Sequence, residues 1–366
     1  MNNDVTERPR ESQKSTWSTV EVGDLGEFVN GYPFMPDEWT VSQGDPIIRI
    51  QNLTDPAKPF NYFAGTVATR YRVHDGDLLI SWSASLDAFI WNGPDAWLNQ
   101  HIFKVTPNTD VVDPDFLYFL MRREIRNIAL SARGSTMKHV TGKIFRQHKV
   151  SIPTLDEQRR IARILSTVRL TQACVYRSTR ILADLRKSVA ARLFAPSDKC
   201  QTVRLGDVIT LQRGHDLPSQ DRVFGPVPVV SSSGITGWHT SSKADGPGVV
   251  IGRYGTLGVV HFVQGPYWPL NTTLYVKDFH GNDPRFVGYF LETLSYEMHN
   301  DKTSVPGVNR NDLHALQIDW PQLADQRRIA KTLDAVERRL TAERGVGSAL
   351  DSVFSAAVSK LLAAET

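Results

Sequence analysis

Residues 152–168 read I-P-T-L-D-E-Q-R-R-I-A-R-I-L-S-T-V, and residues 320–336 read W-P-Q-L-A-D-Q-R-R-I-A-K-T-L-D-A-V. The two stretches lie 168 residues apart. Each of them opens a helix-patterned segment of roughly forty residues. A repeat with so long a period defines the architecture before any local pattern does. The sequence therefore predicts two tandem copies of one unit, each with a globular part followed by a long helix.

Further matches support the duplication. Residues 19–24 (T-V-E-V-G-D) match residues 202–207 (T-V-R-L-G-D), and Gly31 matches Gly214 at the same spacing of 183 residues. Further along, we align Trp97-Leu98-Asn99 with Pro269-Leu270-Asn271, so that Asn99 and Asn271 recur, and Asp113-Pro114 with Asp283-Pro284. The matches keep their order while the spacing falls from 183 to 168 residues, as insertions in the first copy produce.

The composition restricts the class of protein. A chain of 366 residues exceeds one usual core, so we expect two or three domains. Cys174 and Cys200 form neither a disulfide framework nor a metal-ligand spacing, which favours a reducing compartment. No apolar run has the length of a membrane span, and we expect no metal site, because the ten histidines are scattered. The net charge of +3 is too small to identify a nucleic-acid-binding protein by itself.

Local patterns predict an α+β fold. Short β-rich runs separated by turn residues are expected as strands at residues 46–50, 78–82, 101–105, 150–152, 227–230, 248–252, 258–262, 273–276 and 318–320. Helices are expected at residues 115–130 and 284–297, where apolar residues recur at helical spacing. We expect a flexible tail at 1–16, globular domains at 17–153 and 198–321, a central helix at 154–197 and a C-terminal helix at 322–366.

The two long helices carry a heptad pattern that polar residues interrupt. The simplest arrangement for two such helices in one chain is an antiparallel coiled coil with pseudo-twofold symmetry. Gly345 and Gly347 are poor helix formers, costing about 1 kcal/mol each relative to alanine, so we expect the second helix to bend or fray there.

The repeated pattern resembles the specificity subunit of Type I restriction–modification enzymes. The resemblance rests on Pro153, Glu157-Gln158 and Ile161-Ala162 in the first copy and on Pro321, Asp325-Gln326 and Ile329-Ala330 in the second. The stretch 252–258 (G-R-Y-G-T-L-G) is similar to a glycine-containing hairpin of such domains, whereas the first copy departs there, at residues 80–85.

The resemblance implies a chain without chemistry of its own. Two target-recognition domains would each recognise one half of a bipartite double-stranded DNA target, and the helices would dock two methyltransferase subunits. A restriction/translocase subunit can join the complex. No cofactor is expected in this chain, and S-adenosylmethionine and ATP are expected in the partner subunits.

Base edges are contacted chiefly by Arg, Lys, Asn and Gln, helped by hydroxyl and aromatic groups. The candidates for DNA contact are Arg49, Gln51, Asn52, Trp82, Ser83, Lys138, His139, Ser231, Ser232, Ser233, Arg253, Tyr254, Thr256, Asn309 and Arg310. The candidates for subunit docking are Glu157, Gln158, Arg160, Asp325, Gln326 and Arg328, although a solvated helix face accounts for the arginine pairs equally well.

Enzymatic functions lack their motifs in this sequence. It has no glycine-rich methyl-donor loop with an Asn/Asp-Pro-Pro-aromatic motif, no P-loop and no convincing nuclease carboxylate–lysine cluster. The alternative hypothesis is a non-enzymatic coiled-coil scaffold whose two globular domains bind protein or carbohydrate. A specificity subunit requires domains that differ in their loops while the helices stay alike, and the sequence has this pattern.

Overall fold

The computed structural model describes residues 17–363, except residues 56, 84, 132–141, 196, 198, 199, 295 and 297–306. The chain divides into two compact units. Unit 1 comprises residues 1–174 and 347–366, and unit 2 comprises residues 175–346. The division falls inside the two long helices, so each unit contains a piece of both.

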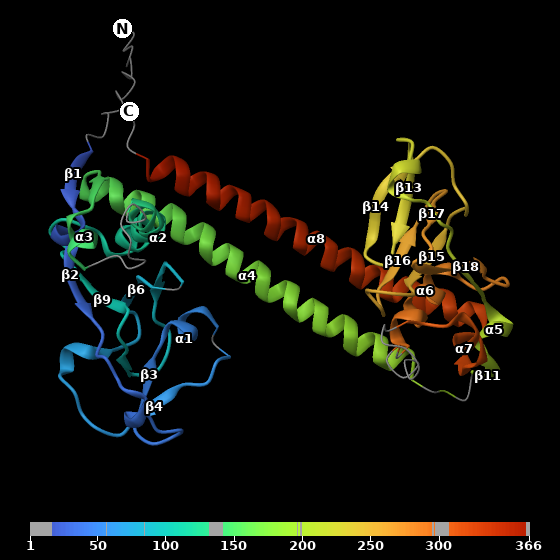
Figure 1. Cartoon of the computed structure of the whole chain (residues 1–366), viewed down its shortest axis with the longest axis horizontal. Coiled ribbons are helices and arrows are strands. Elements are labelled where there is room, and N and C mark those ends of the chain that lie inside the picture. Colours follow the sequence, from blue (N-terminus) through green and yellow to red (C-terminus); the bar gives the residue numbers. More distant parts are fainter. Residues whose placement is uncertain are drawn as a thin grey trace, which may run out of the picture. The chain divides into compact units, whose positions relative to one another are not determined.

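The long helices are α4 (Leu155–Leu193) and α8 (Leu323–Leu361), each continuous over 39 residues (Figure 1). The expected fraying at Gly345 and Gly347 is wrong, because α8 continues as a helix through both positions, and a bend there stays a prediction. The residues around them, such as Glu343, Arg344 and Ala349, are good helix formers. Helix formation is cooperative, so this context outweighs a cost of about 1 kcal/mol for each glycine.

Domain 1 runs from β1 to β10 and lies in unit 1. Its elements are β1 (Ser18–Glu21), η1 (Val22–Leu25), β2 (Gly26–Asn30), η2 (Pro36–Glu38), β3 (Asp45–Ile48), α1 (Ile50–Thr54), β4 (Asn61–Phe63), η3 (Thr69–Tyr71), β5 (Arg72–Val73), β6 (Leu78–Ser81), β7 (Asp87–Ile90), β8 (Ala96–Leu98), β9 (Ile102–Pro107), α2 (Pro114–Ser131), α3 (Gly142–Gln147) and β10 (Lys149–Ile152).

Domain 2 runs from β11 to β19 and lies in unit 2. Its elements are β11 (Gln201–Arg204), α5 (Leu205–Val208), β12 (Thr210–Arg213), η5 (Ser219–Asp221), β13 (Val227–Ser231), β14 (Gly234–His239), β15 (Gly248–Gly252), β16 (Val260–Val263), β17 (Trp268–Pro269), β18 (Thr273–Asp278), α6 (Pro284–Thr293), α7 (Arg310–Ala315) and β19 (Gln317–Trp320).

The two domains share one topology, and the expected α+β class is confirmed. The four-stranded sheet β2-β9-β6-β7 of domain 1 corresponds to β12-β18-β15-β16 of domain 2. The sheet β4-β3-β8-β5 corresponds to the three-stranded sheet β14-β13-β17, and the pair β1-β10 corresponds to β11-β19. Strands β6 and β15 are buried at every position, which explains why each reads as a continuous apolar run.

One helix covers the four-stranded sheet in each domain. In domain 1 the apolar side of α2, including Phe116 and Leu120, packs with Ile80 and Phe103 of the sheet. The side-chain oxygen of Asp113 accepts a hydrogen bond from the Phe116 backbone N–H at 3.0 Å, and Asp283 does the same for Phe286 at 2.9 Å. These aspartates cap α2 and α6 and confirm the two helices expected after Asp113 and Asp283.

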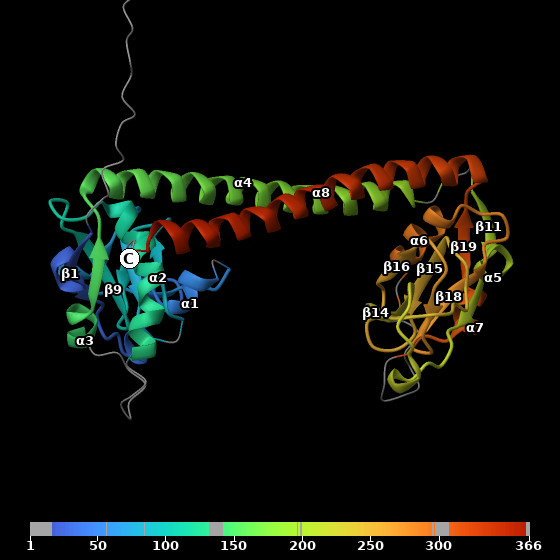
Figure 2. The ribbon, with the colours of Figure 1, turned by 90° about the horizontal axis from the view of Figure 1, so that it is seen from above.

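Within each unit the two long helices run antiparallel. In unit 1, Gln172 of α4 donates a hydrogen bond to Asp351 of α8 at 2.9 Å, and the last turns of α8 lie beside the first turns of α4 (Figure 2). Leu361 and Leu362 pack into the same core as Leu165. The second half of the chain therefore completes the core of the first domain.

In unit 2 the reverse exchange occurs, because the last turns of α4 enter the core of domain 2 through Leu193 and Phe194. Arg186 of α4 contacts Glu292 of domain 2 at 2.5 Å and Glu337 of α8 at 2.6 Å. Burial alone would lower the pKa of Arg186, but its two carboxylate partners raise it. Both units thus join their two helices through a shared apolar core, and unit 2 adds an ionic cluster.

Candidate functional site

Several strand ends meet at one place in each domain, which we call the strand-end cluster. In domain 1 the Asn99 N–H donates to the Ile48 carbonyl at 3.1 Å, and the Trp82 N–H donates to the His101 carbonyl at 3.3 Å. In domain 2 the Leu270 N–H donates to Val230 at 2.8 Å, and the Arg253 N–H donates to Thr272 at 2.9 Å. The C-terminal ends of β3, β6 and β8 therefore lie close together in domain 1, and those of β13, β15 and β17 do so in domain 2.

This geometry corrects one detail of the alignment. Ile48 is adjacent to Leu98 in the parallel β3–β8 pair, and Val230 is adjacent to Pro269 in the β13–β17 pair. Leu98 therefore corresponds to Pro269, and Asn99 corresponds to Leu270. The apparent recurrence of Asn99 at Asn271 is wrong by one position, because a short sequence match did not define the strand register. Trp97 and Trp268 are the residues that do recur.

Arg49 follows β3 in the cluster of domain 1. Its guanidinium carbon lies 4.5 Å from the centroid of the Trp39 ring, and its Nη1 donates to Asn61 Oδ1 at 3.0 Å. Trp39 and Asn61 were not among the candidates, since no local pattern connects residues so far apart. The structure places this arginine at the start of α1 with its side chain held by two neighbours.

Gln51 and Asn52 lie on α1, next to Arg49. Gln51 is half-buried, and its amide donates to the Pro59 carbonyl at 3.4 Å. Asn52 is only 5% exposed, accepts a bond from the Arg49 N–H at 3.1 Å and donates to the carbonyls of Lys58 and Pro59. Its amide is used inside the loop, so Asn52 positions Arg49 and is not available to a base edge.

Trp82 and Ser83 follow β6 in the same cluster. The Trp82 indole donates to Asn30 Oδ1 at 3.1 Å, and its ring lies edge-on to His101 with centroids 4.8 Å apart. The Ser83 carbonyl accepts a bond from the buried hydroxyl of Ser81 at 3.0 Å. His101, which has a φ of 75°, and Asn30 join the cluster without having been predicted. Lys138 and His139 lie outside the described residues.

In domain 2, Ser231, Ser232 and Ser233 form the turn between β13 and β14. Ser231 is 9% exposed, and its hydroxyl contacts the Ser233 hydroxyl at 3.0 Å and the Gly234 carbonyl at 3.2 Å. Ser231 therefore holds the turn. Ser232 is half-buried, and its carbonyl lies 3.1 Å from Nε2 of His261, another residue that sequence reasoning missed.

Arg253, Tyr254 and Thr256 lie on the hairpin between β15 and β16, which confirms the hairpin expected at residues 252–258. The Arg253 guanidinium carbon lies 4.6 Å from the centroid of the Tyr254 ring, and Tyr254 is 39% exposed. Gly255 and Gly258 have φ values of 80° and 76°, a conformation that favours glycine.

The hairpin meets the loop that carries Asn309 and Arg310. The Val308 N–H donates to the Arg253 carbonyl at 2.9 Å, and Tyr254 forms a β-bridge with Gly307. Asn309 caps α7 by accepting a bond from the Asn311 N–H at 2.9 Å, so its side-chain oxygen has a structural role. Both Asn309 and Arg310 are exposed, and the structure brings them to the same cluster as Arg253.

Gln158 and Gln326 face inward and do not lie on a docking surface. Each is 1% exposed. Gln158 accepts from the Asp113 N–H at 2.8 Å and donates to the carbonyls of Pro153 and Val111. Gln326 accepts from the Asp283 N–H at 3.0 Å and donates to the Pro321 carbonyl at 2.9 Å. Their assignment to subunit docking is wrong, because these amides join the start of each long helix to its domain.

We expect Gln158→Ala to destabilise unit 1 by about 2–4 kcal/mol, because it leaves a buried N–H and buried carbonyls without partners. Gln326→Ala should act equally on unit 2. Hydrogen exchange measured peptide by peptide reports the stability of each unit separately. Arg159→Ala is the control, since its ion pair with Asp156 is exposed and such pairs contribute little. Equal protection in Gln158→Ala and the control would contradict the role given to the amide.

The remaining docking candidates form one exposed ion pair at the start of each helix. Glu157 contacts Arg160 at 2.5 Å, and Asp325 contacts Arg328 at 2.9 Å. The Arg160 hydrogen bond holds the pKa of Glu157 below its ordinary value. The side chains of Arg160 and Arg328 are 58% and 67% exposed, so both pairs are available to a partner.

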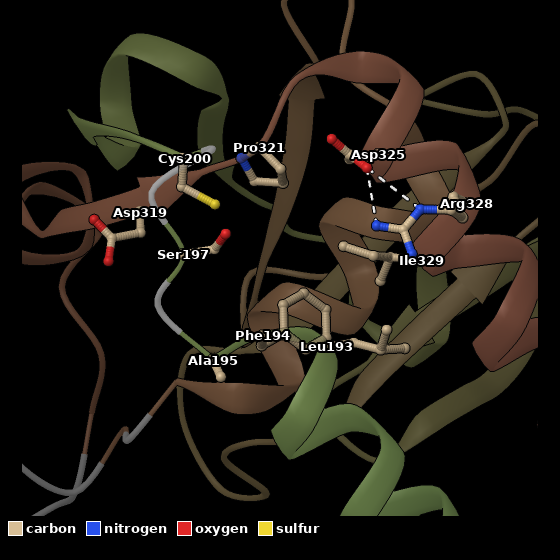
Figure 3. A pocket seen from close by; sticks show the side chains of 10 residues that line it. All are labelled: Leu193, Phe194, Ala195, Ser197, Cys200, Asp319, Pro321, Asp325, Arg328 and Ile329. Carbon is tan, nitrogen blue, oxygen red and sulfur yellow. Dashed lines mark hydrogen bonds and ion pairs between the residues drawn. The ribbon is translucent and has the colours of Figure 1, made fainter.

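Asp325 and Arg328 also line a small pocket of unit 2 at the end of α4, where Cys200 faces Phe194 and Pro321 (Figure 3). Burial, together with the nearby carboxylates of Asp319 and Asp325, raises the pKa of the Cys200 thiol. The thiol therefore stays protonated at neutral pH and is a poor nucleophile.

Within the described residues, no cluster of histidine, cysteine and acidic side chains is arranged to bind a metal ion. No helix among the described parts of the chain combines the length and apolar character that a membrane span needs.

Comparison with known proteins identifies similar sequences and folds. Residues 14–174 and 197–347 match the family model of the Type I restriction modification DNA specificity domain. The chain is 26% identical over 181 residues to the Type I restriction enzyme EcoBI specificity subunit of Escherichia coli, covering 48% of this chain and 38% of that protein. It is 22% identical over 216 residues to the MjaVIII specificity subunit of Methanocaldococcus jannaschii, covering 54% of this chain and 50% of that protein. Its matches thus span half or less of these two relatives.

The fold also matches a solved structure. The crystal structure of a Type I restriction–modification S subunit from M. genitalium superposes with a TM-score of 0.71 at 14% identity, covering 98% of this chain and 99% of that one. At this identity the likeness concerns the fold alone.

Proposed function

We propose, on the premise that this chain belongs to the Type I restriction modification DNA specificity family, that each of its domains recognises one half of a bipartite double-stranded DNA target. Family membership favours this function over a protein- or carbohydrate-binding scaffold. Two recognition domains in one chain bind more tightly than either alone, because the second contact becomes intramolecular.

The observation that carries the proposal is a repeated backbone cluster with different side chains. The hydrogen bonds of the strand-end cluster recur in both domains. The side chains at equivalent positions differ, because Arg49 corresponds to Ser231 and Trp82 corresponds to Arg253. A constant framework that presents different polar groups is what two recognition domains for two different half-sites require.

We assign DNA contact to the accessible side chains of the two clusters. In domain 1 these are Arg49, Gln51, Trp82 and Ser83, and in domain 2 they are Ser232, Ser233, Arg253, Tyr254, Thr256 and Arg310. Asn52, Ser231 and Asn309 position them. Lys138 and His139 stay candidates on the strength of the sequence.

The chain is proposed to act without catalysis, in a cytoplasmic complex. Two methyltransferase subunits would supply the S-adenosylmethionine chemistry, and a restriction/translocase subunit, where present, would use ATP. We expect weak DNA binding by the isolated chain and much tighter binding once methyltransferase subunits are bound.

Mapping of methylated adenine tests the function. A host that expresses the chain with its methyltransferase subunit is compared with a host that lacks only this chain. A split motif that depends on the chain is expected, and replacing residues 17–150 with those of another specificity subunit should change one half-site only. The absence of any chain-dependent motif would contradict the proposal.

The exposed ion pairs are proposed to dock the methyltransferase subunits. We expect Arg160→Glu or Arg328→Glu to remove one bound subunit each, because the reversal places two like charges at one helix start. Arg180→Glu, an exposed arginine outside the repeated motif, makes the same charge change and serves as the control. Sedimentation analysis gives the stoichiometry. Two subunits bound to both reversal variants would show that the pairs are only solvated helix surface.

A further inference from the structure

Two arginines of the strand-end clusters have no carboxylate partner in the part of the chain that the structure describes. Among the described residues, neither Arg49 nor Arg253 forms an ion pair, whereas Arg72 contacts Asp45 at 2.5 Å and Arg122 contacts Asp87 at 2.9 Å. Arg49 and Arg253 are half-buried. An arginine held in such a place without an acidic neighbour presents its donors to an acceptor outside the chain.

An aromatic ring lies against each of the two guanidinium groups. Arg49 stacks on Trp39 with its guanidinium carbon 4.5 Å from the ring centroid, and Arg253 stacks on Tyr254 at 4.6 Å. Asn61 accepts one of the Arg49 donors at 3.0 Å, and no other side-chain acceptor of the described residues is hydrogen-bonded to this guanidinium. Stacking restrains the plane while it leaves this edge free.

A guanidinium group whose orientation is restrained has a preferred partner in double-stranded DNA. Guanine presents O6 and N7 side by side in the major groove, and arginine contacts the two acceptors together. A phosphate group can also accept two hydrogen bonds from an arginine, but a phosphate contact carries no sequence information. Only a contact to guanine makes the reaction rate depend on the identity of one base pair.

The two arginines follow different strands. Arg49 follows β3, where domain 2 has Ser231, and Arg253 follows β15, where domain 1 has Trp82. The same chemical group is therefore presented from two different points of one framework. This difference would place the contacted base at different positions in the two half-sites.

We infer that Arg49 recognises a guanine in one half-site and that Arg253 recognises a guanine in the other, both through the major groove. The inference rests on the proposed DNA-recognition function. It also assigns Trp39 and Tyr254 as positioning residues, because they orient the guanidinium groups.

The test uses the full chain in complex with its methyltransferase subunits. Arg49→Lys and Arg253→Lys keep the positive charge but remove the two-pronged donor fork. Initial methylation rates are measured on duplexes that carry the parental target, and on duplexes in which each G·C pair is replaced in turn. The wild-type complex should discriminate against replacement of one guanine in each half-site, and each variant should lose roughly 5- to 150-fold of that discrimination at its own guanine.

Each variant is the control for the other, because discrimination in the untouched half-site shows that the complex is still folded. Trp39→Leu, which removes the stacking ring, should weaken discrimination at the guanine assigned to Arg49. Trp39→Phe, which keeps a ring, should retain most of it.

Three results would overturn the inference while leaving DNA recognition intact. They are a half-site without any G·C pair, lysine variants that discriminate as well as the wild type, and a loss of rate that is equal on all duplexes. The second result would indicate a phosphate contact. Absence of a chain-dependent motif with the wild-type chain would instead remove the proposed function, and the inference with it.

Discussion

A chain that ends at Val346 should lose the folded structure of domain 1 while domain 2 keeps its own. The removed segment supplies Phe354, Leu361 and Leu362 to the core of unit 1, where Leu362 is 1% exposed. Phe354 also lies against Phe119 of α2, with ring centroids 6.1 Å apart. Burying each large apolar side chain contributes about 1.5–3 kcal/mol, so the loss approaches the 5–15 kcal/mol that stabilises a typical domain.

Hydrogen exchange measures this effect in each unit separately. The control is a chain that ends at Ala363, which keeps every residue of α8 and Leu362. We expect the peptides of β6, β9 and α2 to lose protection in the shorter chain only. Unit 2 contains no residue beyond Val346, so its peptides should exchange alike in both chains. Unchanged protection of β6 and β9 would mean that domain 1 does not depend on the end of α8.

The second large effect is expected at two corresponding glycines, Gly31 and Gly214. A Cβ atom at either position would lie 2.1 Å from a backbone carbonyl oxygen, of Asn99 in domain 1 and of Leu270 in domain 2. Backbone at the centre of the strand-end cluster cannot move aside without breaking the neighbouring hydrogen bonds. We therefore expect Gly31→Ala and Gly214→Ala each to destabilise its own unit by about 3 kcal/mol or more.

Gly265→Ala is the matched control, because apart from the two neighbouring residues no atom lies within 4 Å of the place that a Cβ atom would take there. Thermal unfolding followed in the wild type and the three variants gives the comparison. Gly265→Ala should unfold close to the wild type, whereas each of the other two should shift the transition of its own unit downwards. If Gly31→Ala unfolds with the control, the close approach of the strands does not constrain the cluster.

Much of the fold was predictable because it follows from short-range patterns. The strand at residues 78–82 and the helix after Asp113 were predicted from an apolar run and a capping aspartate, and the structure has β6 and α2 there. Such features depend on residues within a few positions of one another. The alignment of β8 with β17 was not predictable in this way, because it follows from the pairing of β8 with β3 and of β17 with β13, which contacts between distant segments determine.

The candidate site shows the same division. Arg253 and Tyr254 are neighbours in sequence, and their hairpin was expected. The stacking of Arg49 on Trp39 and the hydrogen bond from Trp82 to Asn30 were not, since each joins segments that only folding brings together. The sequence also did not show which polar side chains are buried. Gln158 and Arg160 belong to one repeated motif, yet Gln158 is 1% exposed and Arg160 lies on the surface.

The sequence by itself determined that the chain is a duplication of a globular domain and a long helix, because repeated motifs and helical periodicity are local properties of the chain. Only the tertiary structure decided which motif residues face inward, which strand ends meet and which arginines lie against an aromatic ring. These properties depend on how distant segments pack, and the free energy of packing is a property of the folded unit rather than of any one stretch of sequence.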